Sequence, residues 1–395
     1  MNYCPLTGYI LARFSHKTGY PIGLDISDLS IKLTQLSKSK NKIKIKAIGK
    51  INLEKGIINN GEIINQEKTL EAIKKLISNL KFGNINSDEV VISLPETKTF
   101  IKLIKVHKTA NPIFEIIESE MEKYIPMSID EIYYDWQVVG DDVDKQLILI
   151  SAAPKEMVDQ YVALLNEVKL TVVGIEMEPV SLCRSLLNEE LPGAQGQKNY
   201  AIVDIGAKRT SMTIYSKNTI LFTASLPISG TKITNAIVEA LKIKEIEAEK
   251  AKIVCGLDES KAKGIIKNIL SDNVNELINK IKDAFEFFNN NFYDRGNIDK
   301  ILLCGGGANI KNLSDIIGKS IKIETKPGDA LINLNEDKEK LSKFLIEKHT
   351  IDVDFIKNKD NKKIVKNKLT MTQDISLSFA TSIGLALRGI FIDEI

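Results

Sequence analysis

Two stretches of the chain share one pattern of apolar and polar positions. Residues 22–36 read IGLDISDLSIKLTQL and residues 201–210 read AIVDIGAKRT, so each places an aspartate, Asp25 or Asp204, in an apolar run before a polar turn. A carboxylate in a buried strand must be paired or hold a metal, because burying an isolated charge is costly. Each aspartate taken singly could also be a turn former. The repetition favours the opening hairpins of two related α/β halves over that alternative.

Small and hydroxylic residues continue both hairpins. They are Ser27 and Ser30 in the first hairpin and Gly206, Thr210 and Ser211 in the second. Successive backbone N–H groups and hydroxyls in such turns bind anions. If the two turns face each other across a cleft, phosphates would lie between them, and Asp25 and Asp204 would hold the neutralising Mg²⁺ through water. The paired hairpins therefore predict a nucleotide site.

A third segment carries a cluster of glycines. Residues 300–317, KILLCGGGANIKNLSDII, follow the pattern of a strand, a turn and a helix. Gly305, Gly306 and Gly307 would let a ligand approach the backbone closely. The spacing is neither that of a Walker loop nor that of a dinucleotide fingerprint. A tight strand-to-helix turn is the alternative for this motif alone.

A helical pattern lies between the second hairpin and the glycine cluster. Apolar residues from Ile233 to Leu241 fall on one helical face, with Gly230 and Thr231 expected as the preceding loop and cap. In the following run EAEKAK, Glu249 and Lys252 are three residues apart and share a helix face. The alternative for this pair is an exposed ion pair of little energetic value.

The pattern changes after Pro95 and predicts a small insert of strand, helix, two strands and helix. TKTFIKLIKV alternates as a strand, and Asn111 and Pro112 would open a helix that ends before Pro126. EIYYDWQVV and KQLILISAA read as strands, followed by a helix from Lys155. Aromatic residues gather in this insert: Phe100, Phe114, Tyr124, Tyr133, Tyr134 and Trp136. Packing in a small core is the alternative to a binding role for them.

Composition narrows the function classes. The 395 residues include 54 Lys and Arg against 52 Asp and Glu, which gives no global signature of nucleic-acid binding. The sequence has no run of eighteen apolar residues and no signal-peptide pattern at its start, so we expect a cytoplasmic protein. The four cysteines lack metal-site spacing and suit free thiols. The lysine run from Lys357 to Lys368 favours a solvated loop over a contact with anionic lipid.

In their order along the chain, the two Asp hairpins, ISGTKIT, EAEKAK and CGGGA resemble the actin-like ATPase superfamily. More narrowly, the chain is similar to the PilM family of type IV pilus assembly proteins, in the FtsA-like branch of that superfamily. The segments that carry this resemblance are VVISLPETKTFIKLIKV, ESEMEKYIPMSIDEIYYDWQVVG, APKEMVDQYVALL and SIGLALRG. The resemblance implies an α/β fold with two related halves around a nucleotide cleft, an inserted α+β subdomain and a helical cap.

The resemblance also implies roles for individual residues. Asp25 and Asp204 would sit at Mg²⁺ and the phosphates of ATP or ADP, and Glu178 would orient water. The other implied nucleotide-binding residues are Ser27, Ser30, Lys32, Gly206, Thr210, Ser211, Gly230, Glu249, Lys252, Gly305, Gly306, Gly307 and Ala308. Two departures from the family pattern bear on hydrolysis: Ser27 stands where glycine is usual, and Lys208 and Arg209 replace small or hydroxylic residues. Hydrolysis is therefore expected to be slow.

The predicted organisation is discontinuous. It comprises a lead-in at 1–20, half I at 21–95 with returns at 171–198 and 375–395, the insert at 96–170, half II at 199–225 with a return at 299–330, a helical cap at 226–298 and a Lys-rich segment at 331–374. The stretch from Ile375 is expected to be an amphipathic helix that closes half I.

Two classes of function remain open. The favoured one is an ATP-binding scaffold of the pilus inner-membrane platform, recruited to the inner face of the cytoplasmic membrane, whose insert takes the cytoplasmic tail of a PilN-like membrane protein. The alternatives are a small-molecule kinase on the same fold and an FtsA-like filament former tethered by a terminal amphipathic helix. A kinase would need a base beside a substrate pocket. The short segment ALRGIFIDEI ends in acidic residues, which weakens a membrane anchor.

Overall fold

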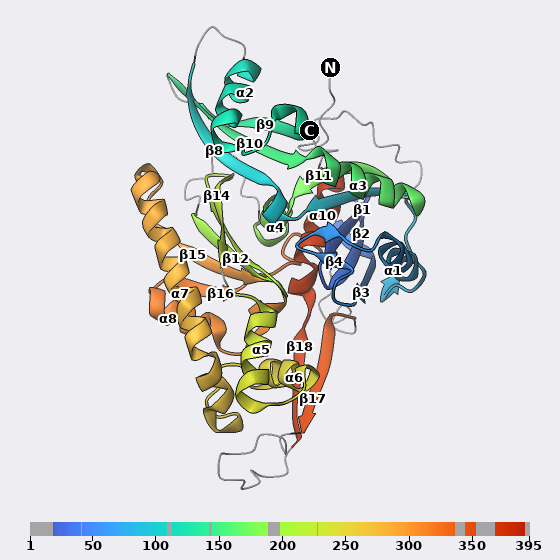
Figure 1. Ribbon diagram of the computed structural model, residues 1–395, viewed down its shortest axis with the longest axis vertical. Coiled ribbons are helices and arrows are strands. Elements are labelled where there is room, and N and C mark those ends of the chain that lie inside the picture. The colour runs from blue at the N-terminus through green and yellow to red at the C-terminus, as the bar shows by residue number, and fades with distance from the viewer. Residues whose placement is uncertain are drawn as a thin grey trace.

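The computed structural model describes residues 19–40, 42–108, 113–141, 144–188, 198–226, 228–335, 344–352 and 368–391. Figure 1 shows a body of two sheets, with a small sheet and helix α2 projecting at one end and helices α5 and α6 at the other. The predicted lead-in, residues 1–20, lies outside the described part apart from its last two residues.

The first sheet has six strands in the order β11–β7–β1–β2–β3–β6. Its strands are β1 (Ile22–Ser27), β2 (Ser30–Ser39), β3 (Lys42–Asn52), β6 (Phe82–Gly83), β7 (Glu89–Leu94) and β11 (Thr171–Met177). Strands β1, β2 and β3 form an antiparallel meander, β7 runs parallel to β1, and β11 runs parallel to β7. Beside this sheet lie two helices, α1 (Gln66–Ser78) and α4 (Glu178–Leu186), and the short hairpin of β4 (Ile58–Asn59) and β5 (Glu62–Ile63).

The second sheet repeats this arrangement with five strands in the order β14–β13–β12–β15–β16. They are β12 (Tyr200–Ile205), β13 (Thr210–Ser216), β14 (Thr219–Leu226), β15 (Lys300–Cys304) and β16 (Glu324–Pro327), with α8 (Leu313–Ile321) between the last two. Here β12, β13 and β14 form the meander, β15 runs parallel to β12, and β16 runs parallel to β15. The equal order and direction of the strands confirm the prediction of two related α/β halves.

The insert forms a three-stranded antiparallel sheet in the order β8–β10–β9, covered by α2. Its elements are β8 (Phe100–His107), α2 (Ile113–Tyr124), β9 (Ile132–Asp141), β10 (Lys145–Pro154) and α3 (Lys155–Glu167), in the predicted sequence of types. The three strands and α2 share a hydrophobic cluster of their own, whereas α3 packs Tyr161 and Leu165 into the cluster of half I. Asn111 and Pro112, the expected helix start, lie outside the described residues.

Three helices form the cap: α5 (Gly230–Leu241), α6 (Glu245–Cys255) and α7 (Ile265–Asn291). The expected cap of α5 is wrong by two residues. The Ser229 side chain accepts the backbone N–H of Lys232, and Gly230 is already helical. The serine hydroxyl satisfies one of the free N–H groups of the first turn, so the helix begins directly after it, at Gly230, and not after a cap at Thr231.

A hairpin of β17 (Ile346–Asp352) and β18 (Lys368–Asp374) extends beside α6, within the segment expected to be variable. Of the lysine run only Lys368 belongs to the described residues. Short 3₁₀ turns are η1 (Glu96–Lys98), η2 (Ile129–Glu131), η3 (Ala262–Gly264), η4 (Tyr293–Arg295), η5 (Gly306–Asn309) and η7 (Ser376–Phe379).

The last described helix, α10 (Ala380–Phe391), lies on half I, as its residues were expected to do. It is not a half-exposed surface helix, however, because every residue from Ala380 to Ile390 is buried. A Cβ at Gly23 would lie 2.1 Å from the carbonyl oxygen of Ser382, so glycine lets α10 rest directly on β1. Arg388 is 4 % exposed and reaches Glu176 of β11, which Arg184 of α4 also binds at 2.7 Å.

The burial of α10 leaves it no apolar face for a membrane, so the structure offers no support for a terminal anchor of the FtsA kind on this segment. In the described part of the chain, no helix is both long and apolar enough to span a bilayer.

Candidate functional site

The first turn, Ser27–Ser30, joins β1 to β2, with Ser27 and Ser30 paired across it. Asp25 lies opposite Lys32 in the register, and the Lys32 Nζ donates to the Asp25 carboxylate at 2.7 Å. Both side chains are largely buried, at 6 % and 11 % exposed for Asp25 and Lys32. The carboxylate in this strand is thus paired, as a buried charge must be.

The second turn, Gly206–Arg209, joins β12 to β13. It places four residues between the paired Ile205 and Thr210, whereas the first turn places two between Ser27 and Ser30. The Gly206 N–H donates to the Arg209 carbonyl at 2.8 Å and closes the turn. The N–H groups of Gly230 and Thr231 donate to the carbonyls of Gly206 and Ala207 at 2.9 and 2.8 Å. The start of α5 therefore holds the second turn in place.

The glycine cluster stands beside the second aspartate, since β15 runs parallel to β12 and pairs Cys304 with Asp204. Gly305 has a φ of +73°, and a Cβ there would lie 2.1 Å from the Asp204 Oδ1. A Cβ on Gly307 would lie 2.2 Å from Ile205, whereas one on Gly306 would meet open space. Close packing thus requires Gly305 and Gly307, and Gly306 faces the cleft.

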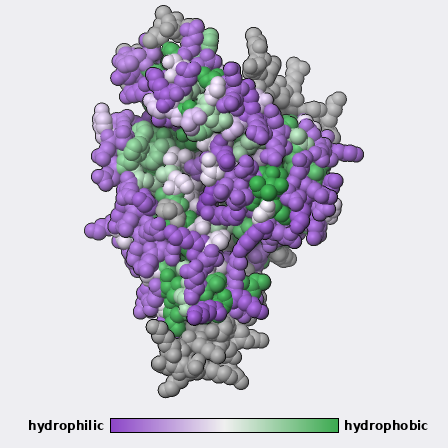
Figure 2. All heavy atoms as spheres, viewed as in Figure 1, coloured by the Kyte–Doolittle hydropathy of each residue, from purple (hydrophilic) through white to green (hydrophobic). Residues whose placement is uncertain are grey.

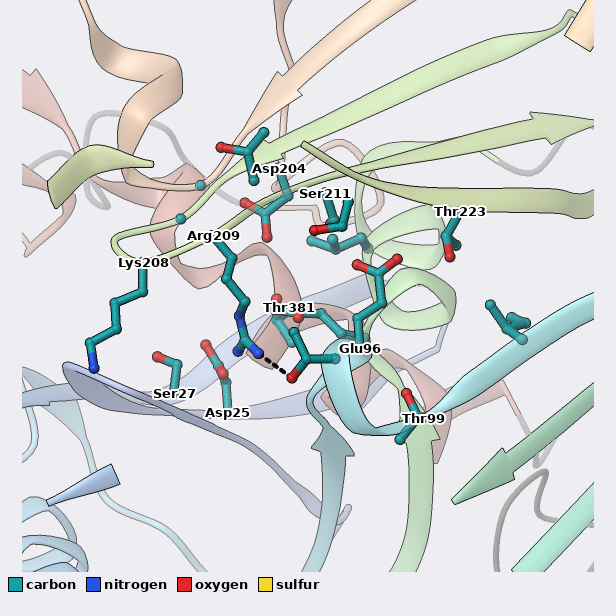
Figure 3. A pocket seen from close by; sticks show the side chains of 18 of the residues that line it. Asp25, Ser27, Glu96, Thr99, Asp204, Lys208, Arg209, Ser211, Thr223 and Thr381 are labelled. Atoms are coloured by element: carbon teal, nitrogen blue, oxygen red, sulfur yellow. Dashed lines mark hydrogen bonds between the residues drawn. The ribbon is translucent and has the colours of Figure 1, made fainter. Parts of the chain in front are cut away.

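The two turns face each other across a cavity of about 520 Å³, the first cavity, which Figure 3 shows from close by. Predicted residues that line it are Asp25, Ser27, Ser30, Lys32, Glu178, Asp204, Gly206, Thr210, Ser211, Gly305 and Gly306. A second cavity of about 630 Å³ adjoins it and shares Gly206 and Gly306. Its lining contains Gly230, Glu249, Lys252 and Gly307.

The structure therefore gathers the predicted residues around two adjoining cavities, with one exception. Ala308 is 3 % exposed and lines neither cavity. Glu249 and Lys252 are not the exposed ion pair of the alternative interpretation, because Lys252 is 7 % exposed. Its Nζ donates to Glu249 at 2.7 Å, to Thr234 at 2.9 Å and to the Gly230 carbonyl at 3.2 Å. Lys252 thus fixes α6 to the start of α5.

Glu178 begins α4 directly after β11, at the expected strand-to-helix corner. Burial, together with the negative charges of Asp204 and Asp25, raises the pKa of Glu178 to about 8. Burial also raises the pKa of Asp204 to about 6, against the opposing charge of Lys32. These carboxyl groups repel one another, so a cation that entered the first cavity would relieve the repulsion.

The donor set suits magnesium held through water. In the part of the chain that the structure describes, no three His, Cys, Asp or Glu side chains stand close enough to ligate one ion. Magnesium keeps several waters and takes few protein ligands, so Asp25 and Asp204 on facing strands can hold its hydration shell. When bound, the ion would neutralise phosphate charge.

Sequence reasoning missed several residues of the first cavity, among them Asp28, Lys50 and Glu96. Asp28 is 4 % exposed; its Oδ1 accepts the Gly61 N–H at 2.8 Å, and its Oδ2 has no partner. The Tyr161 hydroxyl donates to the carbonyl of the same Gly61 at 2.7 Å. An acidic residue inside an anion-binding turn was the available signal for Asp28, whereas Glu96 is placed by tertiary structure alone.

The first cavity continues beyond the two turns into the insert. There its lining is apolar and comes from β8, α2 and β10, with Phe100, Ile101, Ile104, Tyr124 and Ile150. We call this part the apolar arm. Tyr124 is 48 % exposed, and the Lys102 Nζ lies 3.2 Å from the centre of its ring. In Figure 2 hydrophobic residues gather on the surface beneath the insert.

Comparison with known proteins identifies the family. The model of the family "Type IV pilus assembly protein PilM" matches residues 23–351. The chain belongs to the PilM family. The match includes both turns, the insert, the cap and the glycine cluster.

Solved structures confirm the fold of this family member. A "PilM-PilN type IV pilus biogenesis complex" matches with a TM-score of 0.74 at 20 % identity, over 94 % of this chain and 98 % of that one. The ethanolamine utilization protein EutJ from Carboxydothermus hydrogenoformans matches with a TM-score of 0.50 at 14 % identity, over 93 % and 89 %. The fold is that of the actin-like ATPases, as the order of the motifs predicted.

Proposed function

We propose that this PilM-family protein is a cytoplasmic, nucleotide-binding scaffold of type IV pilus assembly. Its cleft would bind ATP or ADP with Mg²⁺, and its insert would dock the cytoplasmic tail of a PilN-like membrane protein at the inner face of the membrane. The family gives the place in pilus assembly. The observation that carries nucleotide binding is the facing pair of turns with Asp25 and Asp204 on either side of the first cavity.

The two cavities suggest how a nucleotide would lie. Its phosphates would occupy the first cavity between the turns, and its ribose and base would occupy the second cavity beside Glu249 and Lys252. Gly206 and Gly306 line both cavities and would stand where the two parts of the nucleotide meet. Each turn belongs to a different half, so a bound nucleotide would set the angle between them.

Calorimetry with ATP and ADP tests this site. The wild type should bind both only with Mg²⁺, and Asp204→Ala and Gly306→Asp should each lose binding. Gly306 is the informative glycine, because it lines the cavity and a Cβ there would meet no protein atom. Unchanged affinity in both variants would refute the site. Turnover well above about one per second would contradict a scaffold and support the kinase alternative.

The apolar arm is the proposed place for the partner's tail. It offers apolar anchors in a pocket, which is how short peptides are commonly bound. The PilM protein of the matching structure is in complex with PilN, and we extend that partner to this chain by proposal. The arm is continuous with the phosphate cavity, so the two ligands would act on the same pair of halves.

Fluorescence anisotropy with a labelled peptide of the partner's cytoplasmic tail tests docking. Tyr124→Ala should weaken binding by about ten-fold or more, because truncating an aromatic anchor is costly. Phe114→Ala is the matched control, since Phe114 is 52 % exposed on the same helix and outside the cavity lining. Equal losses in the two variants would contradict docking in the apolar arm.

Coupling between the sites is tested with the same assay. Peptide affinity should differ between ADP and a non-hydrolysable ATP analogue by about five-fold or more, and the peptide must change nucleotide affinity by the same factor. Asp25→Ala should remove the nucleotide effect and leave peptide binding intact. Equal peptide affinities without nucleotide, with ADP and with the analogue would leave at most a passive scaffold.

A further inference from the structure

Arg209 of the second turn crosses the first cavity and contacts η1, the turn between half I and the insert. Its NH1 donates to the Thr97 Oγ1 at 2.7 Å, and Figure 3 shows the side chain passing between Asp204 and Asp25 toward this contact. Thr97 belongs to η1, the turn that connects β7 to the first strand of the insert. The Thr97 hydroxyl in turn donates to the Asn60 carbonyl at 3.3 Å. One side chain of half II thus holds the entry to the insert.

The neighbouring Lys208 differs in direction. Its Nζ donates to the Asn59 Oδ1 at 3.1 Å, and in Figure 3 the side chain extends away from Arg209. Both cations were expected to depart from the family pattern, but only Arg209 enters the group of carboxylates. Arg209 lines the first cavity, and its positive charge opposes the rise in the pKa of Glu178 that burial causes.

The contact between Arg209 and Thr97 is weak relative to what a guanidinium can form. The neutral Thr97 hydroxyl accepts a single bond from Arg209, whereas a phosphate group accepts two parallel charge-assisted bonds from the planar guanidinium. A polyphosphate between the two turns would offer such an acceptor within the cavity that Arg209 already lines. The phosphate is the stronger acceptor, so it would displace the Thr97 hydroxyl from Arg209.

We propose that Arg209 distinguishes ATP from ADP by exchanging Thr97 for the terminal phosphate. With ADP or without nucleotide, Arg209 stays on Thr97 and ties half II to η1. With ATP, it binds the terminal phosphate and releases η1 and the base of β8. This inference rests on the proposed nucleotide site and names the residue that distinguishes a triphosphate from a diphosphate there.

Calorimetry with ADP and a non-hydrolysable ATP analogue tests the exchange through two changes of opposite sign. Arg209→Ser should weaken binding of the analogue by about ten- to hundred-fold, which is the usual effect of losing a hydrogen bond to a charged group. It should change ADP affinity by less than about two-fold. Thr97→Val removes the competing acceptor without changing the shape, so it should strengthen the analogue by about two- to ten-fold. Lys208→Ser is the charge-matched control and should leave the preference between the two nucleotides as in the wild type.

The double variant makes the test specific. If Thr97 acts only by competing for Arg209, Thr97→Val has no effect on analogue affinity in the Arg209→Ser background. Arg209→Lys should restore part of the affinity, because it keeps the charge but loses the bidentate geometry. In the wild type, amide hydrogen exchange in residues 96–107 should be faster with the analogue than with ADP, and Arg209→Ser should remove that difference.

Three outcomes would overturn the inference alone, with nucleotide still bound: equal losses of ADP and analogue in Arg209→Ser, weaker analogue binding in Thr97→Val, or a Thr97→Val effect that persists without Arg209. Failure of the wild type to bind either nucleotide would instead refute the proposed function and the inference together.

Discussion

The two turns of the nucleotide cleft are built on the same hairpin but manage charge differently. In the first, two residues separate the paired Ser27 and Ser30, and Asp25 is neutralised by Lys32 of the adjacent strand. In the second, four residues separate Ile205 and Thr210, and the cation Arg209 leaves its own hairpin for Thr97 of half I.

This difference shows that equivalent aspartates need not be equivalent in energy. The charge of Asp25 is balanced within half I, so it contributes to the stability of the ligand-free protein. Asp204 lies among carboxylates, and its raised pKa shows that the ligand-free cleft disfavours its charge. The negative charge at the second turn is therefore the one that a bound cation would balance, and four experiments test the contrast.

The largest expected effect comes from removing Asp25. Asp25→Ala leaves Lys32 buried without its partner and should destabilise the protein by about 3 kcal/mol, the usual result of breaking a buried pair. Asp204→Asn should leave stability unchanged or raise it, because it removes a disfavoured charge. Both variants should lose Mg²⁺-dependent nucleotide binding. Denaturant unfolding with calorimetry measures the two quantities, and equal destabilisation by both changes would abolish the contrast.

The next effect concerns the support of Asp204 by the glycine cluster. Gly305→Ala forces alanine into positive φ and against the Asp204 carboxylate, so it should lower the free energy of unfolding by at least about 1–2 kcal/mol. Gly306→Ala is the control in the next position and should leave stability unchanged, because its Cβ meets no protein atom. Thermal unfolding of both variants is the measurement. A stable Gly305→Ala protein would show that Asp204 is not held from this side.

The pH dependence of stability should reveal Glu178. Unfolded glutamate releases its proton near pH 4.5, whereas the buried side chain keeps it to about pH 8. The folded state thus holds more protons in this window, and the ligand-free protein should lose stability as the pH rises, by at most about 1.4 kcal/mol per pH unit for one group. Glu178→Gln should flatten this part of the curve. An unchanged slope would place the titration elsewhere.

The smallest effect tests the support of the first turn. Tyr161→Phe removes the hydrogen bond to the Gly61 carbonyl and should lower the free energy of unfolding by about 1 kcal/mol. The N–H of the same Gly61 donates to Asp28 in the first turn. Tyr133→Phe serves as comparison, because the Tyr133 hydroxyl donates to Asp159 at an exposed site at 3.2 Å. Denaturant unfolding should separate the two. Equal losses would mean that the contact under the first turn is no stronger than a surface one.

Much of the fold follows from local patterns. The two hairpins, the glycine turn and the insert's order of elements rest on periodicity and turn residues, which act over a few neighbours. The burial of α10 did not follow from its sequence, because a helix that is covered by β1 and α4 needs no polar face. Packing at that position is decided by strands far away in the chain.

The site divides in the same way. Asp25 and Asp204 carry their own signal, since a carboxylate in an apolar run is conspicuous. The sequence marked Arg209 only as a departure from the expected family pattern. Nothing in the residues around Thr97 indicates that its hydroxyl accepts a hydrogen bond from Arg209 of the opposite half. Contacts across the cleft depend on how two sheets are set against each other, and neither hairpin encodes that alone.

The joining of α10 to half I has a consequence for how the chain is made. Arg388 donates to the Ile175 carbonyl across 213 residues of sequence and reaches Glu176, while half II is complete between Tyr200 and Pro327. During synthesis half II is therefore complete before α10 is made, whereas Glu176 and the α10-facing side of β1 in half I stay uncovered until α10 has been synthesised. The strand β1, which carries Asp25 and leads into the first turn, therefore acquires its packing against α10 only after the whole of half II has been made.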